Sequence, residues 1–164
     1  MSDAAVVNVV ELRRRLGTRR SLSLDANFDD LAVGSTFVPA DHPVHVALDI
    51  ESVSDGVITA GHISADWIGE CRRCLEPVDG QLDVAVQELF ADAGDPDEIY
   101  LIDGDVIDLA NMIHDTLMLN LPQAPLCRAD CRGPDPDHYP ALVESDDRRP
   151  DPRWSALSEL RLDE

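Results

Sequence analysis

A chain of 164 residues with 33 acidic and 13 basic side chains is long enough for one domain and carries a formal net charge of −20. Such a charge excludes nucleic-acid binding over most of the surface, because nucleic acids are bound mainly by neutralising their phosphates, and it favours either plain solubility or a basic protein partner. The 44% of hydrophobic residues is enough for a core, no stretch reaches the roughly 20 apolar residues that span a bilayer, and an acid precedes the first apolar run, so we expect a cytoplasmic protein with no membrane partner.

The first predicted element is a short strand or helix over residues 8–16, closed by Gly17. An arginine-rich segment overlaps it, and all thirteen basic residues of the chain are Arg. Its five members are candidate contacts for RNA or for an acidic partner group: Arg13, Arg14, Arg15, Arg19 and Arg20. The alternative is a solvated helix face whose arginines pair with nearby acids of the same chain.

Three strands are predicted next, in the order of an antiparallel meander. Residues 44–51 alternate apolar and polar side chains, which is the period of a half-buried strand. Asp55-Gly56 predicts a hairpin turn, since Gly tolerates the positive φ of tight turns, and residues 57–69 return as the second strand. Residues 82–86 alternate again and predict the third strand.

The clearest helix is predicted over residues 105–120, after an acidic linker at residues 91–99. Asp105 is its expected N-cap, and Pro122 ends it because proline cannot continue a helix. One apolar stripe would bury this helix against the sheet: Val106, Leu109, Ile113 and Leu117. His114 is expected at the rim of that contact rather than as a metal ligand.

These elements predict an α+β fold in which an antiparallel β-meander packs against one main helix. We expect a single domain over residues 1–132, with the arginine-rich segment at its N-terminus. From residue 133 the composition is Pro, Asp and Arg with little to bury. Residues 133–164 are therefore predicted to form a flexible tail that ends in a short helix near Trp154.

The four cysteines of the chain fall into two closely spaced pairs, Cys71 with Cys74 and Cys127 with Cys131. Such pairs can place four thiolates tetrahedrally around Zn²⁺, whereas a reducing cytosol disfavours structural disulfides. We therefore predict a structural zinc site formed by all four, a zinc-ribbon-like clasp that ties the middle of the fold to its C-terminal end. Arginines within or beside the pairs would either contact RNA phosphate or offset the negative charge of the site: Arg72, Arg73, Arg128 and Arg132.

An enzyme is the competing class of function, either a thiol-disulfide exchanger or a zinc-dependent enzyme. A redox Cys-x-x-Cys begins a helix after a strand, whereas Cys71 and Cys74 fall between two predicted strands. A catalytic zinc keeps an open coordination position, which four cysteines would fill. No catalytic motif stands elsewhere in the sequence, so we expect no catalytic residues and no small-molecule substrate.

Three blocks of the sequence carry a resemblance. They read Cys71-Arg-Arg-Cys-Leu-Glu-Pro-Val78, Leu121-Pro-Gln-Ala-Pro-Leu-Cys-Arg-Ala-Asp-Cys-Arg-Gly133 and Asp151-Pro-Arg-Trp-Ser-Ala-Leu157. In this order they resemble the signatures of the YceD family of large-ribosomal-RNA-subunit accumulation proteins, over most of the chain from about residue 10. The resemblance implies a non-enzymatic role in making or stabilising large-subunit ribosomal RNA. It also implies a ribosomal protein or a pre-ribosomal particle as partner, with RNA as a further candidate.

One segment departs from the family pattern. Many relatives hold a further Cys-x-x-Cys-Gly after the second block, where this chain reads Gly133-Pro-Asp-Pro-Asp-His-Tyr-Pro140. The site must then use Cys127 and Cys131, recruit His138 or hold no metal, and retention of the four cysteines favours a four-cysteine site. A zinc-stabilised interaction domain unrelated to ribosomes is the other binding function left open.

Overall fold

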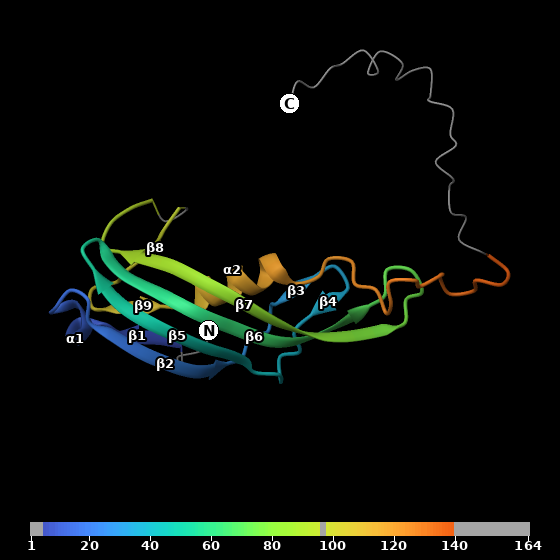
Figure 1. The fold of residues 1–164 in the computed structure, drawn as a ribbon, viewed down its shortest axis with the longest axis horizontal. Coiled ribbons are helices and arrows are strands. Elements are labelled where there is room, and N and C mark those ends of the chain that lie inside the picture. The colour runs from blue at the N-terminus through green and yellow to red at the C-terminus, as the bar shows by residue number, and fades with distance from the viewer. Residues whose placement is uncertain (1–4, 96–97, 140–164) are drawn as a thin grey trace, which may run out of the picture. The chain divides into compact units, whose positions relative to one another are not determined.

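Long antiparallel strands make up most of the first part of the chain, and one helix packs against their sheet (Figure 1). The computed structural model describes residues 5–95 and 98–139, and the chain divides into two units, residues 1–131 and 132–164. The predicted α+β class, with mostly antiparallel strands, is confirmed. No helix in the described residues is long and apolar enough to cross a membrane.

The large sheet is built around four long antiparallel neighbours in the order β2, β5, β6 and β7. Its strands are β2 (Arg19–Ala26), β3 (Ala32–Val33), β4 (Thr36–Phe37), β5 (Val44–Val53), β6 (Gly56–Glu70), β7 (Pro77–Ala91) and β8 (Tyr100–Leu101). Strand β4 pairs with β6 near the end of β6, and β8 runs parallel to β7. A separate two-stranded sheet joins β1 (Val6–Asn8) to β9 (Val106–Asp108), and the helices are α1 (Val10–Arg13) and α2 (Ala110–Asn120).

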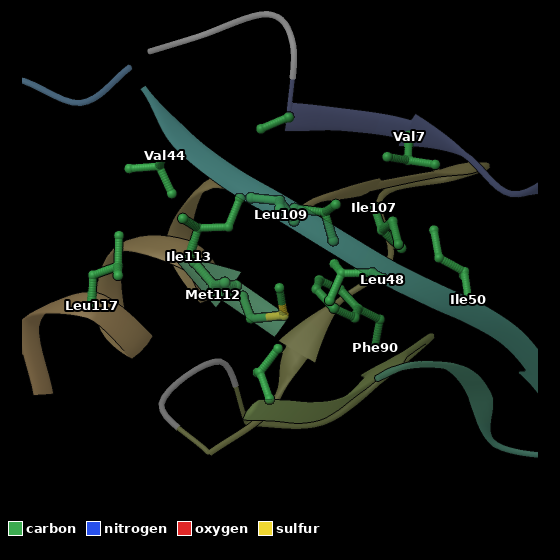
Figure 2. Packing of buried hydrophobic residues seen from close by; sticks show 14 of the residues in the cluster. Val7, Val44, Leu48, Ile50, Phe90, Ile107, Leu109, Met112, Ile113 and Leu117 are labelled. Atoms are coloured by element: carbon green, nitrogen blue, oxygen red, sulfur yellow. The ribbon is translucent and has the colours of Figure 1, made fainter. Parts of the chain in front are cut away.

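Apolar and polar side chains alternate along β5, and the apolar ones mark the buried face of the sheet. Val46, Leu48 and Ile50 each expose 3% of their surface or less, while the residues between them are more exposed. Figure 2 shows Leu48 and Ile50 in one cluster with Met112 of α2 and other apolar side chains from the sheets and the helix. Because each such side chain contributes about 1.5–3 kcal/mol when fully buried, this cluster fixes the helix against the sheet.

The predicted helix begins too early, and this prediction was wrong over its first turn. Residues Val106–Asp108 form β9 and pair with β1, so the helix begins at Ala110. Asp105 is therefore not the N-cap. Asp108 is the acid that contacts the start of the helix, because its Oδ1 accepts a hydrogen bond from the Ala110 backbone N–H at 2.9 Å. Pairing with a distant strand overrode the local helical pattern.

Two other elements differ from the sequence prediction. Residues 8–16 contain the end of β1 and the four-residue helix α1, and the strand β2 that follows was not predicted. The turn between β5 and β6 consists of Ser54 and Asp55, while Gly56 already pairs with Val53. The hairpin itself is confirmed, with its turn one residue earlier than expected.

Truncating one buried residue of α2 should test how much stability its packing on the sheet supplies. We expect Leu117→Ala, at a fully buried position, to lower the free energy of unfolding by about 2–5 kcal/mol. Leu119→Ala is the matched control, because Leu119 is 83% exposed on the same helix and its truncation should cost less than about 0.5 kcal/mol. Urea unfolding measures both, and equal losses would contradict the packing.

Candidate metal centre

All four cysteines meet at one place, where the turn between β6 and β7 approaches the segment that follows α2 (Figure 1). Cys71 and Cys74 lie in that turn, and Cys127 and Cys131 lie in the segment. Their four Sγ atoms are all within 4.8 Å of one another. The Sγ atoms of Cys71 and Cys131 are 3.8 Å apart, and those of Cys74 and Cys127 are 3.7 Å apart.

These separations fit a tetrahedral metal site and do not fit disulfides. Four sulfurs placed about 2.3 Å from a central Zn²⁺ at tetrahedral angles lie about 3.8 Å from one another. A disulfide would need an S–S distance of about 2.05 Å, and all four cysteines are free. An all-sulfur donor set with this geometry is typical of structural zinc or of iron–sulfur centres. The residues present can therefore hold a metal ion.

A tight turn of the backbone turns the first pair of thiols inward. The Cys71 N–H donates to the Glu76 carbonyl at 2.9 Å, and the Leu75 N–H donates to the Cys71 carbonyl at 2.9 Å. Leu75 has a φ of +62°, the only positive φ among the described residues other than glycine. Because this conformation costs a non-glycine residue roughly 1–2 kcal/mol, it persists only where the surroundings hold it.

Backbone groups fasten the second segment to this turn. The Arg72 N–H donates to the Pro125 carbonyl at 2.9 Å. The Arg73 guanidinium reaches further, and its Nη1 donates to the carbonyls of Cys131 at 2.7 Å and Ala129 at 3.3 Å. Arg73 is therefore a positioning residue that fixes the backbone carrying one of the four sulfurs.

The surroundings shift the pKa values of two of the thiols in opposite directions. Backbone N–H groups, first that of Cys127 and then that of Cys74, lower the pKa of the Cys71 thiol to about 6. The hydrogen bond with Cys131 raises the pKa of Cys127 to about 12. Four thiolates so close together would repel one another strongly, and a bound cation would remove that repulsion.

Several of the predicted contact arginines pair with acids of the same chain. The pairs are Arg13 with Asp92, Arg14 with Glu11, Arg19 with Glu51 and Arg128 with Asp130. Arg20 donates to the Asn8 carbonyl at 3.1 Å. Within the described residues, no side-chain hydrogen bond or ion pair is formed by Arg15, Arg72 or Arg132.

The two groups of arginines do not share one surface in the first unit. Arg19 lies opposite Glu51, which in turn faces Ile58 near the start of β6, whereas Cys71 follows the end of β6. Twelve residues of strand separate Ile58 from Glu70, a distance of about 40 Å at the usual rise. Contact of these arginines with RNA stays a prediction.

Some predicted residues take no part in the cysteine cluster, and some partners could not be predicted. His138 bonds through its ring Nδ1 to Asp135 Oδ1 at 2.9 Å, and the group of candidate ligands found in the described residues contains the four cysteines alone. Trp154 lies outside the described residues. No local pattern indicated that Thr36 fastens the second segment, which it does by donating to the Pro122 carbonyl at 2.8 Å.

Comparison with known proteins finds one family and several relatives. The family model for the large ribosomal RNA subunit accumulation protein YceD matches residues 59–161, which include both cysteine pairs. Uncharacterized proteins of Mycobacterium bovis and Mycobacterium tuberculosis are each 36% identical to the chain, over 98% of its length and 83% of theirs. An uncharacterized protein of Mycobacterium leprae is 34% identical, over 72% of this chain and 59% of its own. No solved structure matches the chain significantly.

Neutralising Arg73 should weaken metal binding without touching a sulfur. We expect Arg73→Gln to lower the affinity for Zn²⁺ roughly tenfold, since residues that orient metal ligands typically contribute that much. Arg72→Gln is the matched control, because the neighbouring side chain has no partner among the described residues. Competition with a chromophoric chelator measures both affinities, and an equal change in the two variants would refute the positioning role.

Proposed function

The chain belongs to the YceD family of large ribosomal RNA subunit accumulation proteins, and from this premise we propose that it supports the accumulation of large-subunit ribosomal RNA as a non-enzymatic binding protein. The observation that carries the proposal is the family match, which spans both cysteine pairs. The family name implies a role with that RNA. Such a role fits the cytoplasm.

The cysteine cluster has a structural role in this proposal. It binds one Zn²⁺ ion through Cys71, Cys74, Cys127 and Cys131, which the sulfur separations support. Four protein ligands complete a tetrahedral zinc site, so no coordination position is left to activate water. This closed ligand set supports a clasp over a zinc-dependent enzyme.

A basic protein of the large subunit, or a pre-ribosomal particle that contains one, is the proposed partner. The net charge of −20 favours a cationic partner and opposes phosphate. Several arginines proposed as RNA contacts are already paired with acids, which weakens direct RNA binding relative to protein binding. An interaction domain unrelated to ribosomes is the second candidate, and the partner identity separates the two.

Loss of the protein should lower large-subunit ribosomal RNA in its host. We expect deletion of the gene to reduce the ratio of large-subunit to small-subunit RNA, and wild-type protein to restore it. Affinity capture at low salt should recover large-subunit proteins or precursor RNA with the protein. An unchanged ratio together with no ribosomal component captured would contradict the proposed function.

Removal of the metal should loosen one end of the domain rather than unfold it. Protein purified without added zinc should contain one equivalent, and a chelator should remove hydrogen-exchange protection from residues 71–76 and 122–131. The buried cluster around Leu48 and Met112 should keep its protection, because its packing does not involve the cysteines. Uniform loss of protection across β5, β6 and α2 would refute this.

A further inference from the structure

Two large apolar side chains lie exposed beside each other where β4 meets β6. Phe37 and Ile68 are direct partners in the antiparallel register, and they expose 41% and 37% of their surfaces. Both line a pocket of about 580 Å³, which Glu70, Pro77 and Asp79 also line. We call this feature the Phe37 pocket.

The register of the sheet places two carboxylates around the apolar pair. Ile68 faces Asp79 across β6 and β7, and Glu70 faces Pro77 one pleat further on. Because side chains alternate along a strand, Glu70 shares the face of Ile68. Directly opposed side chains in an antiparallel pair have Cβ atoms about 4.5–5.5 Å apart, so Asp79 stands immediately beside the apolar surface.

These two carboxylates differ from the other acids on the same face of the sheet. Five of those acids have partners in the chain: Asp25 with His45, Asp49 with Ser21, Glu51 with Arg19, Asp66 with Gln81 and Asp83 with His62. Within the part of the chain that the structure describes, Glu70 and Asp79 make no side-chain hydrogen bond or ion pair. Two carboxylates without a partner in the described residues therefore lie beside the exposed apolar pair Phe37 and Ile68.

We propose that the Phe37 pocket binds a basic peptide segment of a protein partner, with one apolar side chain of the segment against Phe37 and Ile68 and flanking Lys or Arg side chains beside Glu70 and Asp79. An apolar anchor would bury the exposed pair, and the cations would pair with carboxylates that have no partner. The inference rests on the proposed function for the class of partner and adds the surface that receives it.

Charge decides against the other occupants of the pocket. A second copy of this chain carries a net charge of −20, and an RNA strand carries phosphates, so Glu70 and Asp79 would repel both. The cysteine cluster lies beside the pocket in the chain, since Cys71 follows Glu70 and the turn returns to Pro77. A metal held there would therefore fix the ends of the two strands that line the pocket.

A defined peptide tests the proposal on the full zinc-loaded chain. The probe is a short synthetic peptide with one Leu between pairs of Lys, and its binding is followed by the amide resonances of Gly34, Gly69 and Val78. We expect saturable shifts centred on these residues and weaker binding at high salt. The same peptide with Ser in place of Leu, or with Glu in place of Lys, should bind at least roughly tenfold more weakly.

Variants of the chain supply the matching controls. Phe37→Ser should reduce binding of the Leu–Lys peptide about tenfold or more, whereas Leu119→Ser, at an exposed apolar position on α2, should leave it unchanged. Double reversal, Glu70→Lys with Asp79→Lys, should exchange the preference from the Lys peptide to the Glu peptide. This exchange would show that the reversed chain is folded and that these two charges select the peptide.

Other outcomes would overturn the proposal. These are equal binding of the Leu and Ser peptides, undiminished binding by the Phe37→Ser variant, dimerisation that Phe37→Ser abolishes, and shifts in residues 140–164 when Phe37 alone is replaced. A failed peptide test with a lowered ribosomal RNA ratio on gene deletion refutes the pocket alone. Peptide binding with an unchanged RNA ratio and no ribosomal component captured refutes the proposed function and keeps the pocket.

Discussion

The pairing of β6 with β7 over fifteen positions is the constraint on which the other features depend. A strand of fifteen residues spans about 50 Å, whereas the eleven residues of α2 span about 16 Å. One helix therefore covers only part of the hairpin. The far end has too little helix to bury its residues, and there the chain supplies the cysteine cluster and the segment over residues 122–131. Phe37 and Ile68 stay open to solvent for a different reason, because they lie on the opposite, exposed face of the sheet with Asp66 and Glu70.

Charge is organised along the same hairpin. Toward the middle of the sheet and the end that carries the turn between β5 and β6, acids pair with Arg, His or Gln. These pairs contribute little to stability because they are exposed. At the cysteine end, Glu70 and Asp79 have no partner among the described residues. The proposed metal and the proposed peptide both bring positive charge to this end. A single region would then contain both the proposed metal site and the proposed surface for a basic partner.

Local patterns were enough to predict β5, most of β6 and the body of α2, because one side of each is buried and the period of burial shows in the sequence. They also predicted which cysteines meet. The early start of the helix was wrong because Val106–Asp108 pair as β9 with β1, nearly a hundred residues away. Strand β2 was missed although Leu22 and Leu24 alternate with serines. The partner of Arg19 could not be predicted, since Glu51 becomes its neighbour only through the register of β2 on β5.

Cys71 and Cys131 lie far apart along the chain, so the four-cysteine cluster can form only late during synthesis. Sixty positions separate the two, and they include all of β7, β8, β9 and α2. Closing so large a ring is entropically costly, about 4 kcal/mol in the chain-entropy treatment of cross-links, so the ring closes after the local hairpin has formed. A nascent chain still short of Cys131 cannot complete the four-cysteine cluster. The clasped end therefore marks a polypeptide whose translation has passed that point.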